Sequence, residues 1–224
     1  MNENVFDRSY YYVYEDKTSE NYIKRQVMYQ QELKRIYRYV GQPINKILDY
    51  GCGLGNFLEL FEPDCKKYGV EISEYAQNEA MKKNIKFDIH KEDEGTFDLV
   101  VFRGSIAYID DKKEVLKYAT SMLSDKGSLI LLSVPNPKSL CYRLFHTLPL
   151  LEPDKQHYLC SSTEIVSILR NLGFKSIRIK KPYWDTPYAK RGSDVFNFIK
   201  RLIGKKTPPF AFWGNVYEIY AKRK

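Results

Sequence analysis

Three glycines and one carboxylate lie close together near residue 50 and could bind a small ligand. Residues 49–56 read DYGCGLGN, so Gly51, Gly53 and Gly55 stand at alternate positions just after Asp49. Because glycine has no Cβ, the backbone there can approach a ligand closely, and a helix that follows would offer unpaired N–H donors at its first turn. The alternative is a glycine-rich turn that binds nothing.

The spacing of the glycines and the charge beside them indicate which ligand to expect. Dinucleotide-binding turns follow the pattern G-x-G-x-x-G, whereas Asn56 stands in the place of the last glycine. The Asp49 carboxylate would repel a pyrophosphate, but it would attract a ligand that carries an ammonium and a sulfonium charge. These residues therefore favour S-adenosylmethionine over NAD as the cofactor.

A second carboxylate, Glu71, follows twenty positions after Gly51, at the end of a short apolar run. In that place it could accept hydrogen bonds from both hydroxyls of a ribose, and each such charge-assisted bond contributes about 1.5–3 kcal/mol. The alternative is a solvent-exposed glutamate at the end of a strand. Because both cofactor families use such an acid, Glu71 indicates a nucleotide without deciding which one.

Groups that could act on a methyl acceptor follow two later apolar runs. Arg103 and Tyr108 come after the first, and His146 and His157 come after the second. An imidazole titrates near pH 6.5, so we expect His157 to be the general base; it could instead orient a loop or contact the substrate. We expect Arg103 and Tyr108 to be the other catalytic residues, whereas His146 would only end a helix.

The cysteines and histidines do not form a recognisable metal-binding pattern. Only three histidines accompany the four cysteines, which have no paired short spacing: Cys52, Cys65, Cys141 and Cys160. The sequence therefore predicts neither a metal site nor a disulfide framework, and reduced thiols fit a cytoplasmic protein.

The elements that must position these residues alternate between strands and helices. A helical pattern covers 20–40, and apolar strands are expected at 46–50, 68–72, 85–89, 97–102, 128–134, 174–180 and 212–221. Helices are expected at 57–61, from Ser73, at 112–123 and after Ser162. Unalternating apolar strands separated by helices predict an α/β fold, a doubly wound and mostly parallel sheet with helices on both faces.

Length and composition predict a single domain. The chain has 224 residues, of which 43% are apolar, enough for one core. We divide it into an N-terminal helix and lid (1–42), a core (43–180), an insertion (181–211) and a final strand (212–224). The tyrosines of the lid could close over the cofactor or merely pack on the core: Tyr10, Tyr11, Tyr12 and Tyr14. The sequence has neither an apolar run of membrane-spanning length nor a signal-peptide pattern.

The positive charge is concentrated at the C-terminal end. Residues 175–224 hold thirteen of the 36 Lys and Arg residues but three of the 28 Asp and Glu residues, which indicates an anionic partner there. Within this section, residues 195–206 predict a basic amphipathic helix. It could make a peripheral contact with an anionic membrane, receive a phosphorylated substrate, or simply pack on the domain.

Several segments together resemble the class I S-adenosylmethionine-dependent methyltransferases. Residues 48–55 and 69–73 are similar to motif I and the acidic loop of that family, and 97–101, 126–130 and 173–174 are similar to its later strands. The resemblance covers about 46–180 and implies a seven-stranded sheet in the order 3-2-1-4-5-7-6 with the last strand antiparallel. The site residues that it implies fall into three groups. Asp49, Gly51, Cys52, Gly53 and Gly55 would surround the methionine end, Glu71 and Ile72 the ribose and adenine, and Arg103, Gly104 and Ser105 the sulfonium.

The sequence lacks motifs that are typical of nucleic-acid methyltransferases, and this narrows the class of acceptor to expect. Arg103-Gly104-Ser105 is not the Asn/Asp-Pro-Pro-aromatic loop of amino-methylating nucleic-acid enzymes, and no Pro-Cys pair offers a nucleophile for cytosine, so DNA is not expected. No RNA-binding module is recognisable. A weaker resemblance to small-molecule methyltransferases of bacterial surface-polysaccharide and secondary-metabolite pathways implies a small polar acceptor, such as a sugar or a polysaccharide precursor. The alternatives are a non-catalytic module that binds S-adenosylmethionine and an RNA methyltransferase; the oligomeric state does not follow from the sequence.

Overall fold

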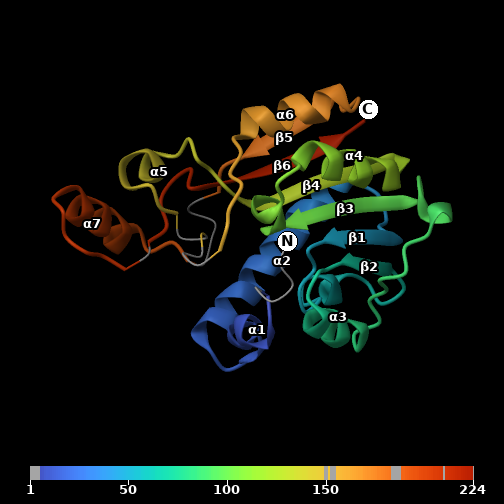
Figure 1. The fold of residues 1–224 in the computed structure, drawn as a ribbon, viewed down its shortest axis with the longest axis horizontal. Coiled ribbons are helices and arrows are strands. Elements are labelled where there is room, and N and C mark those ends of the chain that lie inside the picture. The colour runs from blue at the N-terminus through green and yellow to red at the C-terminus, as the bar shows by residue number, and fades with distance from the viewer. Residues whose placement is uncertain (1–5, 149–150, 152–154, 183–187, 209, 224) are drawn as a thin grey trace.

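Six strands form one sheet at the centre of the described chain, in the order β2-β1-β3-β4-β6-β5 (Figure 1). The computed structural model describes residues 6–148, 151, 155–182, 188–208 and 210–223. The strands are β1 (Lys46–Tyr50), β2 (Lys66–Val70), β3 (Phe97–Arg103), β4 (Leu123–Pro135), β5 (Ser176–Lys180) and β6 (Val216–Lys222). The first four are mutually parallel where they pair, and β6 is antiparallel to both of its neighbours. The predicted fold class and antiparallel last strand are confirmed, and the six strands that form follow the predicted order.

The strand count expected for the sheet was wrong by one, because 85–89 does not form a strand. This segment pairs with β2 through one isolated bridge, between Tyr68 and Lys86. The Gly69 N–H donates to the Lys86 carbonyl at 2.8 Å, and the Lys86 N–H donates to the Lys67 carbonyl at 2.9 Å. The Ile89 N–H then bonds to the carbonyl of Phe87 in its own segment, at 3.2 Å. Because this N–H group bonds within its own segment and not to β2, the pairing ends after one bridge.

The long helix before β1 begins and ends where the sequence predicts. Helix α2 (Glu20–Val40) starts at Ser19, whose hydroxyl accepts from the Tyr22 N–H at 3.1 Å, and ends at Gly41 in the left-handed conformation with φ 68°. The other helices are α1 (Arg8–Glu15), α3 (Glu74–Met81), α4 (Lys112–Met122), α5 (Leu140–Phe145), α6 (Ser162–Asn171) and α7 (Arg191–Leu202). None of the helices in the described segments is long and apolar enough to cross a lipid bilayer.

Two of the differences from expectation concern the segment at 57–61 and the start of the last strand. The helix expected at 57–61 is a single 3₁₀ turn, η2 (Leu58–Leu60), and the chain leaves it at Phe61, two residues before Pro63. The last strand starts at Val216 instead of 212, because the Asn215 N–H closes a turn onto the Phe212 carbonyl around Gly214, whose φ is 76°.

The sheet buries both of its faces, as an open parallel sheet must. Alternate residues of β3 enter different cores: Val100 and Phe102 pack with α4 and α6, whereas Leu99 and Val101 pack with α2 and η2. The helices thus cover both faces, and the carboxyl ends of β1, β2, β3 and β4 meet at one edge of the sheet.

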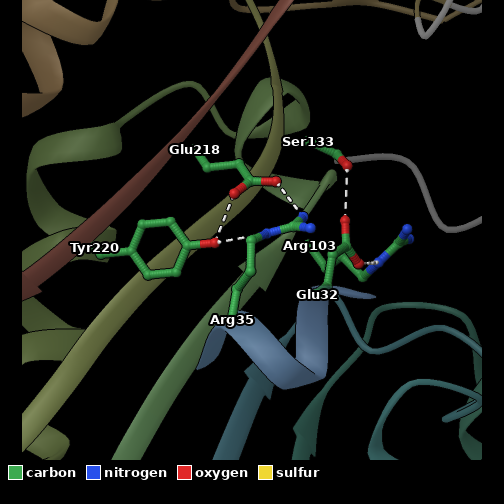
Figure 2. A network of polar contacts seen from close by, with 6 residues as sticks. All are labelled: Glu32, Arg35, Arg103, Ser133, Glu218 and Tyr220. Carbon is green, nitrogen blue, oxygen red and sulfur yellow. Dashed lines mark hydrogen bonds and ion pairs between the residues drawn. The ribbon is translucent and has the colours of Figure 1, made fainter. Parts of the chain in front are cut away.

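Ionic contacts also hold α2 against the sheet (Figure 2). The Arg35 guanidinium donates to Glu218 of β6 at 2.7 Å, and the Tyr220 hydroxyl donates to the other oxygen of Glu218 at 2.5 Å. The Glu218 side chain is 2% exposed. Removing one partner of such a buried pair would leave the other charge buried without its counter-ion. The contact therefore fixes the position of α2 on the sheet.

Candidate cofactor and acceptor site

The loop after β1 is held to β2 by its backbone. The N–H groups of Gly51 and Cys52 both donate to the Val70 carbonyl, at 2.7 and 3.3 Å. Gly51 has φ 84°, and a Cβ built on it would lie 2.4 Å from the Cβ of Ser105. A Cβ on Gly55 would lie 2.2 Å from a methyl group of Ile85. These two glycines are therefore required by the packing of the loop itself as well as by its conformation.

Glu71 ties this loop to the start of α3. One carboxylate oxygen accepts from the Gly53 N–H at 2.9 Å. The other accepts from the N–H groups of Ile72 and Ser73, at 2.8 and 3.0 Å. The oxygen that accepts from Gly53 still has a lone pair for another donor, whereas the other oxygen already accepts two hydrogen bonds, so the expected ribose contact stays a prediction. Ile72, the expected adenine neighbour, is half-buried beside Glu71.

Helix α1 covers the glycine loop. A Cβ on Gly53 would lie 3.3 Å from a ring carbon of Tyr11, which is 5% exposed. Burial, and then the nearby charge of Glu71, raise the pKa of the Tyr11 hydroxyl. Tyr11 forms a small core with Leu54 and Ala76. Of the four N-terminal tyrosines, Tyr11 is thus the one that is buried against the predicted cofactor loop.

Asp49 is buried at the end of β1 with an unsatisfied oxygen. It is 1% exposed, and among the described residues its Oδ1 has no hydrogen-bond partner. Burial raises the pKa of Asp49 to about 7, against the opposing charge of Arg103. A bound cation would stabilise the ionised form of Asp49, which burial disfavours.

Arg103 lies at the end of β3, and its guanidinium points toward α2 (Figure 2). Its Nε donates to Glu32 at 2.8 Å, and its guanidinium carbon lies 4.1 Å from the centre of the Tyr29 ring. The Ser133 hydroxyl donates to the other oxygen of Glu32 at 3.4 Å. In the described part of the chain, Nη2 of Arg103 is buried without a hydrogen-bond partner. Arg103 is therefore a positioned cation with one buried nitrogen whose N–H groups can still donate.

The remaining predicted cofactor residues contribute backbone and packing. The Sγ of Cys52 would lie 2.5 Å from a Cβ on Gly69, so this side chain fills the space that Gly69 leaves. The Ser105 hydroxyl donates to the Tyr50 carbonyl and closes the loop from the β3 side. Gly104, with φ 75°, precedes the 3₁₀ turn η4 (Ser105–Tyr108) and would have open space around a Cβ.

Two of the three predicted catalytic residues lie side by side. The ring centroids of Tyr108 and His157 are 5.1 Å apart, and the Tyr158 N–H donates to the Ala107 carbonyl at 2.8 Å, which holds this segment against η4. Burial, and then the charge of Lys155, lower the pKa of His157. Its Nε2 is buried and has no hydrogen-bond partner in the described segments. His157 is thus a neutral imidazole at pH 7 with a nitrogen available to a proton.

Aromatic rings and a lysine extend this side of the site. The Phe6 ring lies 5.5 Å from that of Tyr108, and the Lys155 ammonium lies 4.1 Å from the centres of both the Phe6 and Tyr10 rings. Flat apolar surfaces next to a cation suit a ring-shaped polar molecule. His146, in contrast, occupies the left-handed position that ends α5, as expected.

Sequence reasoning missed Glu32, which anchors Arg103. It is 1% exposed, and burial raises its pKa against the attraction of Arg103. A signal existed, since Glu32 lies on the helical face that also carries Tyr29, Leu33 and Ile36. A carboxylate inside an apolar helical stripe requires a buried partner.

Two surface hollows lie away from these residues. One of about 510 Å³ is lined by residues such as Asn45, Asp98 and Lys126, at the amino ends of the parallel strands. The other, of about 400 Å³, lies against α6 and Ile179. Open α/β sheets bind ligands at the carboxyl ends of their strands, so neither hollow is the candidate site.

Comparison with known proteins agrees with this geometry. A family model described as a methyltransferase domain matches residues 22–179. An uncharacterized protein of Methanocaldococcus jannaschii is 24% identical over 185 residues, which cover 78% of this chain and 83% of the relative. A SAM-dependent methyltransferase of Archaeoglobus fulgidus has a similar fold, with a TM-score of 0.61, 22% identity and coverage of 95% of this chain and 99% of that one. Magnesium protoporphyrin IX methyltransferase of Synechocystis, with bound SAH, gives a TM-score of 0.60, 16% identity and coverage of 98% and 97%.

Proposed function

This chain belongs to the S-adenosylmethionine-dependent methyltransferases, and from that premise we propose that it methylates a small polar acceptor, such as a sugar or a cell-surface polysaccharide precursor. When bound, the cofactor supplies a methyl group already activated on a sulfonium. The protein must therefore hold both reactants in line, exclude water and remove a proton where the acceptor loses one.

The observation that supports the placement of the cofactor is a pair of buried, unpartnered polar atoms of opposite kind. Asp49 Oδ1 is an acceptor and Arg103 Nη2 is a donor, and neither has a hydrogen-bond partner in the described part of the chain. Unsatisfied buried polar atoms are costly, so two at the carboxyl edge of one sheet call for a ligand. The amino-acid end of S-adenosylmethionine carries an ammonium for Asp49 and a carboxylate for Arg103.

The opposite end of the cofactor is assigned to Glu71 and Ile72. Glu71 already orients Gly53 and can accept from ribose hydroxyls, and the half-buried Ile72 offers an apolar surface for adenine. Tyr11 would cover the cofactor from α1 and exclude water. These roles fit the residues present, because a Cβ on Gly53 would lie 3.3 Å from the Tyr11 ring, and the nearby charge of Glu71 contributes to the raised pKa of the Tyr11 hydroxyl.

His157 is assigned the role of general base, with Tyr108 holding its ring. The imidazole is neutral at pH 7, because burial lowers its pKa, and Nε2 can accept the acceptor's proton. Lys155, beside Phe6 and Tyr10, would attract an anionic group on the acceptor. A sugar ring with a phosphate or carboxylate fits this combination of ring surfaces and positive charge.

Methyl transfer itself tests the proposal. The protein is incubated with S-adenosylmethionine labelled in the methyl group, together with sugar phosphates, nucleotide sugars or, for comparison, total tRNA. We expect label in a sugar fraction, loss of transfer in His157→Gln, and normal transfer in His90→Gln, a matched change at an exposed histidine. Label that goes to tRNA instead, or transfer that is unaffected by His157→Gln, would overturn the acceptor or the base assignment, respectively.

A further inference from the structure

Helix α7 attaches to the rest of the chain by one narrow face. The Phe198 ring stacks on Phe212 with centroids 4.5 Å apart and packs edge-on against Phe145 of α5 at 5.6 Å. Asp194, one turn earlier, is 3% exposed, and its carboxylate accepts from the Lys190 N–H at 2.6 Å. These contacts define the inner face of the helix.

The outer face of α7 is apolar and exposed. Val195, Phe196, Ile199 and Leu202 are 45%, 57%, 51% and 51% exposed, and Ile203, just after the helix, is 66% exposed. At 100° per residue, the four helical positions span an arc of about 120°. A solvent-facing stripe of this width is unusual on a helix whose opposite face already packs on the domain.

Positive charge frames this stripe, and no exposed acid interrupts it. Residues 190–206 contain six Lys and Arg residues and one acid, Asp194, which is buried. Lys205 and Lys206 are exposed directly after the helix, and the Lys200 ammonium lies 4.3 Å from the centre of the Phe196 ring. A lysine that lies along an apolar stripe can keep its stem in an apolar layer and its charge at the layer's polar surface.

We propose that the outer face of α7 and Gly204–Lys206 bind the surface of an anionic lipid bilayer. A bilayer surface presents an apolar layer under negative headgroups, which matches the apolar stripe and its basic frame. A second copy of this chain fits less well, because two such basic surfaces repel each other. Nucleic acid would match the lysines but would leave Phe196, Ile199 and Leu202 in water.

The position of α7 gives this contact a consequence for the site. Figure 1 shows α5 and α7 beyond the end of the sheet toward which β3 runs, apart from α3, α4 and α6. That end carries Arg103 and the loop after β1. Binding through α7 therefore holds the candidate site near the lipid surface, where an acceptor with a lipid tail would be concentrated. The binding itself does not depend on the proposed acceptor and is measured without cofactor.

Vesicle sedimentation of the full chain tests the proposal. We expect it to sediment with vesicles of phosphatidylcholine and phosphatidylglycerol but not of phosphatidylcholine alone, and to be released by high salt. Because one lysine near an anionic surface changes partitioning about fivefold, Lys205→Glu with Lys206→Glu should weaken binding about 30-fold or more. Phe196→Ser with Ile199→Ser should weaken it at least about tenfold.

Matched variants elsewhere separate this surface from general effects. Lys113→Glu with Lys117→Glu changes two exposed lysines of α4, and Met81→Ser changes a residue of α3 that is 49% exposed. Both should bind vesicles like the unmodified protein. Lys205 and Lys206 are exposed after the end of α7, so the variant that changes them remains a valid test even if Phe196→Ser alters folding. Failure to sediment with anionic vesicles, equal loss in the control variants, or an α7 variant that changes only the oligomeric mass or only RNA binding would overturn the proposal.

Discussion

Replacing Asp49 by Asn should stabilise the cofactor-free protein and weaken cofactor binding at the same time. The substitution keeps the shape of the side chain but removes a carboxylate that is 1% exposed and has an unpartnered oxygen. In the free protein the ionised carboxylate lowers the stability of the fold, since burial raises the pKa of Asp49 to about 7. In the complex, the same charge would meet the ammonium of the cofactor.

The size of the stability effect follows from the pKa. A free Asp titrates near pH 3.9, so the folded protein binds more protons than the unfolded chain between about pH 4 and 7, and stability falls as pH rises through that window. The loss reaches up to about 4 kcal/mol at pH 8 and about 1.5 kcal/mol at pH 5. Asp49→Asn removes this penalty. For a chain of this size, each kcal/mol raises Tm by about 2–4 °C.

The effect on binding has the opposite sign. Loss of one charge-assisted hydrogen bond, about 1.5–3 kcal/mol, weakens S-adenosylmethionine binding about 10- to 150-fold. In the unmodified protein, about one tenth of Asp49 is ionised at pH 6 and about half at pH 7, so affinity should rise about fivefold over that interval, while an α-amino group stays protonated. The variant should lack this rise.

Two measurements check the reasoning. Thermal unfolding without cofactor, at pH 5 and pH 8, should show a gain in Tm for Asp49→Asn that is larger at pH 8. Calorimetric titration at pH 6 and pH 7 should show the loss of affinity and of its pH dependence. The account of Asp49 would be refuted by a variant that is no more stable than the parent at pH 8, or by one that binds S-adenosylmethionine equally well.

Three further variants test other parts of the site. His157→Gln should lower kcat by about 10²- to 10⁴-fold and leave the Kd of the cofactor within about twofold. Because burial lowers the pKa of His157, the kcat of the parent should fall only below about pH 6.5, and an unchanged kcat in His157→Gln would contradict the assignment. Tyr11→Ala should speed cofactor dissociation about tenfold in stopped-flow measurements, and an unchanged rate would mean that α1 does not cover the cofactor. Arg35→Met should lower the unfolding free energy by about 3–5 kcal/mol, because it leaves the Glu218 charge without its counter-ion. Adding Glu218→Gln should restore most of this loss. A loss well below this range in Arg35→Met alone would show that the ion pair does not hold α2.

Local signals predicted most of the fold. Ser19 and Gly41 delimit α2, because each supplies the side chain or the backbone conformation that a helix end needs. The expectation failed at 85–89, where an apolar segment at the edge of the sheet forms one bridge. Whether an edge segment completes a ladder depends on its partner strand, which periodicity does not encode.

The site was predictable to the extent that it depends on backbone near the glycines. The loop at 51–55 and the place of Glu71 follow from spacing, and the structure brings them together. The anchoring of Arg103 by Glu32 was not predictable from spacing, because 71 residues separate the two and the contact depends on how α2 crosses the sheet. The same holds for Tyr108 and His157, which meet only after the segment behind β4 folds back onto η4.

Calorimetric titration of the purified protein with S-adenosylmethionine and, separately, with NAD tests the central claim most directly. The arrangement of Asp49, Arg103 and Glu71 predicts that S-adenosylmethionine binds and that NAD does not. Binding of NAD in its place, or of neither ligand, would contradict the assignment of this loop as a site for the methyl donor.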